Sequence, residues 1–318
     1  MKILVPAKVH SEFIAENVTI PAGVELIPYS ETDGAPAGAE EAVAVCRWTA
    51  GKAYAPLVEN GENVRWLHTA SAGTDHVITP KIREKQRLAI TDTGPAYEIA
   101  IGEFVLAWML AVTRKLPLLW ERQREKRWEW LTQDELYGKT VGIIGLGPIG
   151  RGIAQRSKAF GMKTIGLRRR PIAVEGVDEV LTGPEGLQRV IAKSDFVVLA
   201  AALTTETRAI IGADELAQMK TSAWLINIAR GEVVDQTALL QALQAGVIAG
   251  ACLDVFEKEP LPLDHPFWEM SNVLIAPHSS SGWSAGLHAR QKTIFLENLK
   301  RFANDEALEN VVDLARGY

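Results

Sequence analysis

Short apolar runs alternate with polar or helical stretches over the first 95 residues of the chain. The runs are almost continuously apolar, which indicates strands buried on both faces of a parallel sheet. We expect strands at 2–5 (KILV), 24–27 (VELI), 42–46 (AVAVC), 64–69 (VRWLHT) and 88–91 (LAIT). The first of these runs is too short for a signal peptide and is interpreted as the opening strand.

A second series of the same kind begins at residue 140. Strands are expected at 140–145 (TVGIIG), 163–167 (KTIGL), 196–201 (FVVLAA), 224–229 (WLINIA), 248–256 (IAGACLDVF) and 273–276 (VLIA). Helical periodicity is seen at 149–160, 236–246 and 285–305. This pattern predicts a doubly wound α/β fold, and a chain of 318 residues predicts two such domains rather than one.

The two series are joined by a strongly apolar stretch and then a charged one. Residues 99–112 (IAIGEFVLAWMLAV) are fewer than a bilayer span needs and include Glu103, so a buried helix is expected. The charged stretch 119–139 contains Trp120, Trp128 and Trp130. Tryptophans there indicate either a subunit or domain contact, or packing against their own domain; both interpretations stay open.

Composition narrows the class of protein. Hydrophobic residues make up 47% and charged residues 23% of the chain, as in soluble globular proteins. A net charge of −5 lacks the basic excess of a nucleic-acid binder. The two cysteines, Cys46 and Cys252, are far apart and suit a reducing compartment. We expect a cytoplasmic protein with no membrane, nucleic-acid or metal partner.

A glycine-rich hexapeptide, GLGPIG (145–150), lies between a predicted strand and a predicted helix. Alone, this spacing also occurs in ordinary turns, but the strand–turn–helix context favours a dinucleotide site. Gly145 would permit the tight turn, Gly147 the approach of a pyrophosphate, and Gly150 the close packing of helix on strand. Pro148 suits a first helical turn, whose free N–H groups attract anions. The expected contacts are Gly145, Leu146, Gly147, Pro148, Ile149 and Gly150.

Three arginines follow the second strand of this domain, where NAD-specific proteins carry an Asp or Glu. Arg168, Arg169 and Arg170 stand there, and no acidic residue occurs between Gly161 and Val174. A carboxylate would repel a 2′-phosphate, whereas guanidinium groups bind it through paired hydrogen bonds. The sequence therefore predicts a preference for NADP(H), with NAD(H) use left open. Arg168 and Arg169 are the main candidates and Arg170 a further one; the alternative is a solvated basic run.

Three polar stretches follow later strands, at the edge where doubly wound sheets hold ligands. They are 227–235 (NIARGEVVD), 253–262 (LDVFEKEPLP) and 275–283 (IAPHSSSGW). Arg230 can clamp a carboxylate, and His278 can move the proton that accompanies hydride transfer. A carboxylate such as Glu259 favours the charged imidazolium and orients the ring. Each residue alone is commonly structural; the combination predicts a catalytic site.

These motifs resemble the D-isomer-specific 2-hydroxyacid dehydrogenase family, which includes D-lactate dehydrogenase, phosphoglycerate dehydrogenase and glyoxylate/hydroxypyruvate reductases. The likeness spans nearly the whole chain and is densest at 135–150, at TTETR (204–208) and at the three polar stretches. It implies reversible reduction of a 2-keto acid to a D-2-hydroxy acid by NADPH. In this scheme His278 is the acid/base paired with Glu259, and Arg230 binds the substrate carboxylate and keto oxygen.

The resemblance also implies further binding residues. Asp254 would bond the nicotinamide amide, and the loop Ser71, Ala72, Gly73 would offer N–H groups to the substrate carboxylate. Cofactor contacts are also expected at Ala202, Thr207, Ala229 and His278. The residues that could line the substrate cleft are Arg47, Trp48, Thr74 and Trp283. Either tryptophan could instead belong to the core.

By the same resemblance the domains are discontinuous. A flavodoxin-like substrate domain (1–98 and 287–318) would contain an inserted Rossmann-type dinucleotide-binding domain (99–286), with a cleft between them that closes on binding. A homodimer built around the cofactor domains is expected. One departure from the family is Ala202, where a proline is common, which leaves the shape of that loop open.

Two other functions stay open. A nucleotide-sensing corepressor of the same fold is one; the set Arg230, Glu259 and His278 argues against it. An NAD-dependent phosphoglycerate dehydrogenase is the other. It is less expected because the sequence stops near Tyr318 with no room for a regulatory domain, although some relatives lack that domain.

Overall fold

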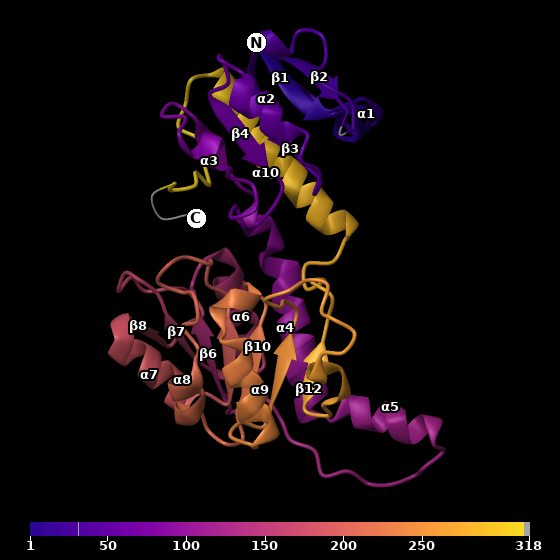
Figure 1. The fold of residues 1–318 in the computed structure, drawn as a ribbon, viewed down its shortest axis with the longest axis vertical. Helices are drawn as coiled ribbons and strands as arrows, with labels where there is room; N and C mark the ends of the chain where they lie inside the picture. Colours follow the sequence, from indigo (N-terminus) through magenta and orange to yellow (C-terminus); the bar gives the residue numbers. More distant parts are fainter. Residues whose placement is uncertain (31, 315–318) are drawn as a thin grey trace. The chain divides into compact units, whose positions relative to one another are not determined.

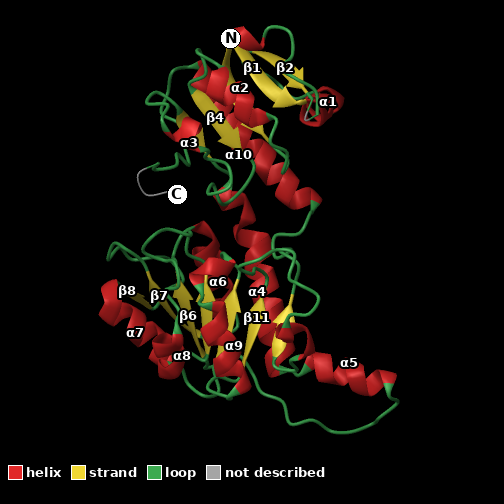
Figure 2. Ribbon diagram, in the orientation of Figure 1, coloured by secondary structure: helices red, strands yellow, loops and turns green. Residues whose placement is uncertain are grey.

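A computed structural model describes residues 1–30 and 32–314 of the chain. The chain forms two compact units, one from Met1–Ala96 and the segment from Trp283 onward, the other from Tyr97–Gly282. The sequence predicted domain boundaries at 98/99 and 286/287, whereas the units meet at 96/97 and 282/283. Both units are α/β structures on wholly parallel sheets, as the sequence predicted (Figures 1 and 2).

Unit 1 is built on a five-stranded sheet in the order β2-β1-β3-β4-β5, which is the flavodoxin-like arrangement. Its strands are β1 (Lys2–Pro6), β2 (Glu25–Tyr29), β3 (Ala42–Arg47), β4 (Trp66–Thr69) and β5 (Ala89–Thr91). Its helices are α1 (Ala7–Ala15), η1 (Ala39–Glu41), α2 (Tyr54–Asn60), α3 (Pro80–Arg83) and α10 (Ala285–Ala303). The short helix η2 (Gly94–Tyr97) leads out of β5.

Helices cover both faces of the unit 1 sheet because successive strand residues point to opposite sides. On one side Leu4 and Leu67 pack with Tyr54 and Val58 of α2. On the other, the strand residues pack with α1 and α10, in a cluster that includes Ile3, Val5, Trp66, Phe13, Phe295 and Leu299. Figure 1 shows α10, the last helix in the sequence, beside strands that come from the first residues. Unit 1 is therefore completed by α10, which follows unit 2 in the sequence.

Unit 2 holds a seven-stranded sheet in the order β12-β11-β10-β9-β6-β7-β8. Its strands are β6 (Thr140–Ile144), β7 (Lys163–Leu167), β8 (Glu179–Leu181), β9 (Phe196–Leu199), β10 (Trp224–Asn227), β11 (Gly250–Leu253) and β12 (Val273–Ile275). Its α-helices are α4 (Glu98–Thr113), α5 (Leu116–Arg124), α6 (Pro148–Ala159), α7 (Gly183–Lys193), α8 (Ala213–Gln218) and α9 (Gln236–Gln244). The short 3-10 helices are η3 (Gly231–Val233) and η4 (Pro266–Glu269). The strand order reverses between β6 and β9, which is the Rossmann switch point.

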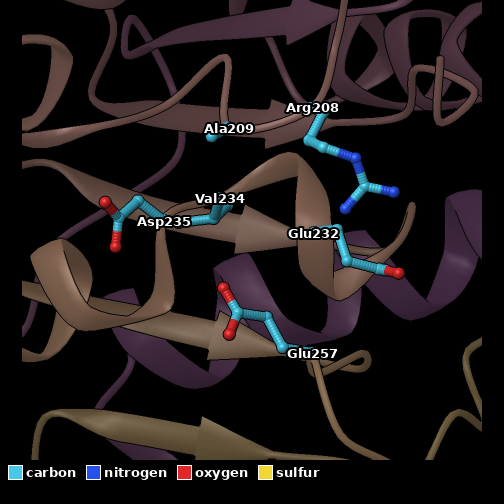
Figure 3. A pocket seen from close by; sticks show the side chains of 6 residues that line it. All are labelled: Arg208, Ala209, Glu232, Val234, Asp235 and Glu257. Atoms are coloured by element: carbon cyan, nitrogen blue, oxygen red, sulfur yellow. The ribbon is translucent and has the colours of Figure 1, made fainter. Parts of the chain in front are cut away.

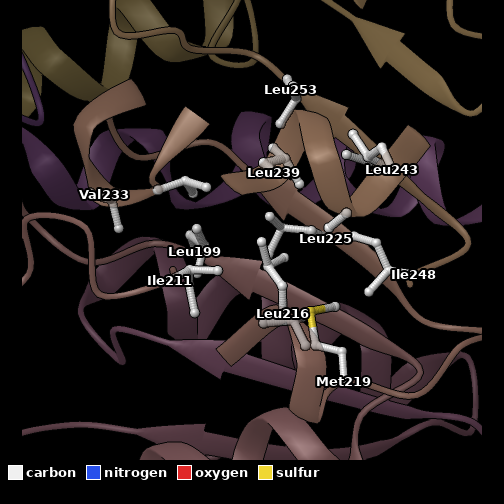
Figure 4. Packing of buried hydrophobic residues seen from close by; sticks show 14 of the residues in the cluster. Leu199, Ile211, Leu216, Met219, Leu225, Val233, Leu239, Leu243, Ile248 and Leu253 are labelled. Atoms are coloured by element: carbon white, nitrogen blue, oxygen red, sulfur yellow. The ribbon is translucent and has the colours of Figure 1, made fainter. Parts of the chain in front are cut away.

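Two separate hydrophobic clusters lie on the two faces of this sheet. One, drawn in Figure 4, packs Leu199 and Leu225 against α8 and α9, through Leu216 and Leu239. The other packs the alternate strand residues against α4 and α6. The central strands are buried on both faces, which explains why their sequences are almost continuously apolar.

Helix α4 accounts for the most apolar stretch of the sequence. The helical stretch Gly94–Thr113 is long and apolar enough, by length and composition, to cross a membrane. Its residues Ile101, Val105 and Met109 are buried in the cluster shared with α6. A core helix passes the same test, so the stretch is not evidence for a membrane span.

The prediction missed the short strand β8 and the helix α5. Strand β8 has three residues, all only partly buried, so it offers no apolar run to detect. Beyond α5, Trp128 and Trp130 are each 97% exposed. Their packing against their own domain, one of the two interpretations left open, is therefore wrong for this pair.

Asp92, next to the end of β5, provides a test of unit 1. Burial raises its pKa to about 6, although Oδ1 accepts the N–H of Gly94 at 2.8 Å. The folded-state pKa is higher than the usual 3.8, so folding stability falls as pH rises through this interval. Asp92→Asn keeps the acceptor and removes the charge. We expect it to raise the unfolding temperature at pH 8, by an amount equivalent to at most about 3 kcal/mol, and to change little at pH 4.

The measurement is thermal unfolding at both pH values, with Glu84→Gln as a control that removes an exposed carboxylate of the same unit. Equal stabilisation of the Asp92 variant at both pH values would contradict the charge-based explanation.

Candidate functional site

The glycine turn connects β6 to α6 at the switch point of the unit 2 sheet. Gly145 has φ +101°, and a Cβ there would lie 2.6 Å from the N atom of Ala201. A Cβ at Gly150 would overlap the carbonyl oxygen of Gly145. The absence of a side chain at Gly150 lets the first turn of α6 lie directly against the end of β6, and its absence at Gly145 lets the turn approach the segment that follows β9.

The start of α6 is open toward an incoming ligand. Pro148 occupies the first helical turn, and Gly147 supplies no side chain to cap the N–H groups there. A Cβ at Gly147 would meet nothing within 4 Å. Free N–H groups and the helix dipole at an uncovered terminus fit the pyrophosphate of a dinucleotide. The residues present therefore fit a nicotinamide dinucleotide; Leu146 and Ile149 complete the turn.

The three arginines lie at the end of β7, next to the glycine turn. The Gly145 N–H donates to the carbonyl of Leu167, so the turn and the start of the basic run are in contact. Arg168 Nη1 donates to the Ile172 carbonyl at 3.3 Å, and Arg169 Nη2 lies 2.9 Å from Oε2 of Glu206. Arg169 and Arg170 are exposed, while Arg168 is partly buried.

On the other side of the glycine turn lies the loop that follows β9. Thr207 Oγ1 donates to the carbonyl of Ala202 at 2.6 Å and accepts the N–H of Thr204 at 2.8 Å. These bonds close the loop on itself. The carbonyl of Ala202 is thus held by a threonine hydroxyl.

His278 and Glu259 are brought together at the end of the sheet. His278 Nδ1 lies 2.8 Å from Glu259 Oε2, and both side chains are partly exposed. Glu259 is itself fixed, because its Oε1 accepts the N–H of Phe256 at 3.1 Å. His278 has φ +51°, a left-handed conformation, and its N–H donates to the Asp254 carbonyl at 2.8 Å. The backbone thus fixes the direction of the ring.

Asp254 anchors the loop that carries His278. Its side chain is fully buried; Oδ1 accepts the N–H of Ser279 at 2.6 Å and Oδ2 that of Ser280 at 3.0 Å. These bonds satisfy a buried carboxylate from backbone donors. The resemblance implied that Asp254 bonds the nicotinamide amide; in the structure its carboxylate bonds the loop that carries His278.

Arg230 follows β10, the strand next to β11. Its Nη1 donates to the Ala229 carbonyl at 2.8 Å, and the Asn227 side chain accepts the Ala229 N–H and donates to the Arg230 carbonyl. Strands β10, β11 and β12 are parallel neighbours, so the segments with Arg230, Glu259 and His278 leave the same edge of one sheet.

The other expected substrate residues lie in unit 1. In the loop Ser71, Ala72, Gly73, after β4, Ser71 Oγ donates to the Gly73 carbonyl at 2.9 Å. Trp48 is only 6% exposed and packs against Phe295 of α10. It is a core residue.

Trp283 differs from Trp48 in being 75% exposed. Both tryptophans lie beside His288, with ring centroids 5.7 Å away for Trp48 and 5.9 Å for Trp283. Arg47 and Thr74, the other two candidates for the cleft lining, are buried.

An open hollow of about 450 Å³ lies in unit 2, next to the segments that follow β9, β10 and β11 (Figure 3). None of the predicted site residues lines it. Its lining residues are Arg208, Ala209, Glu232, Val234, Asp235 and Glu257. Two of its carboxylates have structural partners: Asp235 caps α9 through the Ala238 N–H, and Glu257 accepts the Gln236 N–H. Within 1–30 and 32–314, no group of three or more His, Cys, Asp or Glu side chains could hold a metal ion.

Comparison with known proteins identifies the family. The model of the D-isomer specific 2-hydroxyacid dehydrogenase NAD-binding domain matches residues 106–280. The chain belongs to the D-isomer-specific 2-hydroxyacid dehydrogenases. It is an oxidoreductase with a Rossmann-type unit for a nicotinamide cofactor.

The relatives of this dehydrogenase include enzymes with different names. A glyoxylate reductase of Thermofilum pendens is 39% identical over 251 residues, which cover 76% of this chain and 72% of that protein. A D-3-phosphoglycerate dehydrogenase of Methanocaldococcus jannaschii is 34% identical, over 81% of this chain and 49% of that one. A D-isomer specific 2-hydroxyacid dehydrogenase of Xanthobacter autotrophicus, solved with NADPH and MES, has 30% identity and a TM-score of 0.86, over 100% and 99% of the two chains.

Three polar residues of the dehydrogenase were missed by the sequence reasoning. Gln291 of α10 is buried and donates to the carbonyl of Ala70, directly before the Ser71 loop. His288 accepts from Trp48 and pairs with Glu12. Gln291 could have been found, because it falls on the apolar stripe of α10 with Leu287 and Phe295. Glu206, which pairs with Arg169, gives no such signal, because its partner is 37 residues away.

A matched pair of glycine variants tests the role of the turn. Gly147→Ala places a methyl group in open space before α6, so we expect a normal unfolding temperature and a dinucleotide dissociation constant raised about tenfold or more. Gly150→Ala forces the helix away from the strand and should lower the unfolding temperature by several degrees. Thermal unfolding and fluorescence titration with NADP⁺ measure both. Unchanged binding by the Gly147 variant would contradict the assignment.

Proposed function

We propose that this dehydrogenase reduces a small 2-keto acid to a D-2-hydroxy acid with NADPH, in a reversible reaction. The observation that carries the proposal is the 2.8 Å contact between His278 and Glu259, on the same sheet edge as Arg230 and the glycine turn. A paired imidazole, a guanidinium and a dinucleotide cradle are the groups that reduction of a keto acid requires.

His278 supplies the proton. When the imidazole is protonated, both ring nitrogens are donors. Nδ1–H is held by Glu259, which leaves Nε2–H to be given to the keto oxygen as the alcohol forms. In the reverse direction, neutral Nε2 takes the hydroxyl proton. Glu259, fixed by the Phe256 N–H, keeps the His278 ring in one orientation.

The cofactor residues are assigned by the shape of the turn and the charge beside it. Bound NADPH supplies the hydride that goes to C2 of the keto acid. The N–H groups at the start of α6 hold the pyrophosphate, and Arg168 and Arg169, with Arg170, hold the 2′-phosphate. The other residues assigned to contacts with the cofactor are Ala202, Thr207, Ala229, Asp254 and His278.

Arg230 is assigned to the substrate carboxylate and keto oxygen, because a guanidinium binds paired oxygens through two hydrogen bonds. The backbone N–H groups of Ser71, Ala72 and Gly73 are assigned to the same carboxylate. Trp283 stays a candidate for the substrate side chain. The burial of Trp48 gives it a supporting role in unit 1.

We also propose that the enzyme is a homodimer in the cytoplasm. Trp128 and Trp130, each 97% exposed beyond α5, are large apolar side chains of the kind that subunit interfaces cover. Both cysteines are buried thiols, as suits a reducing compartment.

The second candidate is NAD-dependent phosphoglycerate oxidation, which the relative from Methanocaldococcus jannaschii favours. In an NAD-specific protein, an acidic residue after β7 would bind the ribose hydroxyls of NAD. Arginines stand there in this chain, which favours the NADPH-dependent reduction of a 2-keto acid. A corepressor of the same fold would bind the dinucleotide without turnover.

His278→Gln tests the proton transfer. Glutamine keeps polar atoms but cannot deliver the proton, so we expect kcat for glyoxylate or hydroxypyruvate to fall by about 10²–10⁴. The unfolding temperature should stay close to the wild-type value, because the His278 side chain is half exposed. His10→Gln, on α1, is the matched control and should retain full kcat. Full activity of the His278 variant would refute its role as the acid.

The choice of cofactor is tested by kcat/KM with NADPH and with NADH on the same keto acid. We expect NADPH to be favoured by about tenfold or more, because the arginines gain a phosphate partner only from NADPH. The double variant Arg168→Ser, Arg169→Ser should lose most of that advantage with little change for NADH. Equal use of both cofactors by the wild type would show that the basic run is ordinary surface charge. No turnover of any keto acid with either cofactor would favour the corepressor.

A further inference from the structure

One ion pair joins the two loops that flank the glycine turn. Arg169 follows β7 and Glu206 belongs to the loop after β9, and β6, which leads into the glycine turn, lies between these strands in the sheet. Arg169 Nη2 and Glu206 Oε2 are 2.9 Å apart. The close approach of Gly145 to Ala201 shows how near the second loop comes to the turn. The pair therefore connects loops on either side of the dinucleotide cradle.

The backbone that carries Glu206 is held in place by bonds within its loop. The Glu206 N–H donates to Thr204 Oγ1 at 3.2 Å, and Thr204 is bonded to Thr207, which bonds the Ala202 carbonyl. The loop thus keeps the backbone of Glu206 at a position from which its carboxylate reaches Arg169.

The pair is also easily opened. Its side chains are 41% and 71% exposed, and ion pairs in such positions contribute little to stability. A phosphate dianion offers Arg169 more charge and more acceptor oxygens than one carboxylate does. Arg169 can therefore exchange Glu206 for a phosphate group. Breaking the ion pair takes a small free energy, which reduces the affinity for the phosphate.

We propose that Glu206 is an internal competitor for the 2′-phosphate site and sets how strongly the enzyme discriminates NADP(H) from NAD(H). This inference rests on the proposed function, which assigns Arg169 to the 2′-phosphate. With NAD(H), which has no 2′-phosphate, the Arg169–Glu206 pair stays closed. With NADP(H), the pair opens and the carboxylate remains beside a second anion. Glu206 thus weakens the binding of NADP(H) alone.

The test is equilibrium binding of NADP⁺ and NAD⁺ by calorimetry, which requires no turnover. Glu206→Gln should lower the dissociation constant for NADP⁺ about three- to tenfold and change that for NAD⁺ less than twofold. The gain should shrink in about 1 M salt, where charges are screened over ~3 Å. The control, Glu269→Gln, removes an exposed carboxylate on η4 of the same unit and should leave both constants unchanged.

A double-mutant cycle isolates the pair from the general charge of the loop. In an Arg169→Gln background, Glu206→Gln should no longer tighten NADP⁺ binding. An unchanged NADP⁺ constant in the single variant, or an equal gain without Arg169, would overturn the inference. Weaker NAD⁺ binding in the single variant would also overturn it, because Glu206 would then hold the ribose hydroxyls. Failure of the proposed function is recognised separately: wild-type protein would not prefer NADP⁺ and Arg169→Gln would bind it normally.

Discussion

The close approach between the end of β6 and the first turn of α6 is the constraint on which the rest of unit 2 depends. It exists because Gly150 carries no side chain where a Cβ would strike the Gly145 carbonyl, while Gly145, at φ +101°, permits the turn between them. The helix start, with its free N–H groups, is thereby fixed at the edge where the order of the strands reverses. The arginines, the Ala202–Thr207 loop and the segments after β10, β11 and β12 follow strands of the same parallel sheet. Parallel strands deliver all of these segments to one edge, so residues more than a hundred positions apart can act together.

Much of this arrangement can be predicted from sequence because it depends on burial and on local conformation. Strands covered on both faces are continuously apolar, and eleven such runs correspond to strands of the two sheets. The glycine turn is recognisable because Gly145 and Gly150 each stand where a Cβ would strike backbone atoms. The contact between His278 and Glu259 was predicted as a pairing, and the structure shows the two side chains 2.8 Å apart.

What the sequence does not show depends on partners that tertiary structure alone provides. Strand β8 is too short and too exposed to leave an apolar run. The burial of Trp48 follows from its packing against α10, more than 200 residues later in the chain. Glu206 lies in an ordinary polar loop, and only the strand order brings it to Arg169. Asp254 shows a related limit: the family resemblance implies a contact with the nicotinamide amide, whereas its observed bonds hold the His278 loop.

The return of α10 to unit 1 has a consequence for how the polypeptide matures. The face of the first sheet that bears Ile3, Val5 and Trp66 is covered in part by Phe295 and Leu299 of α10, which leave the ribosome after the whole of unit 2. Unit 2 is one continuous stretch and can complete its core during synthesis. Until α10 emerges, this face of the five earlier strands is covered only by α1. In that interval the nascent chain is open to misassociation, and chaperones that shield apolar surfaces would act on its oldest part.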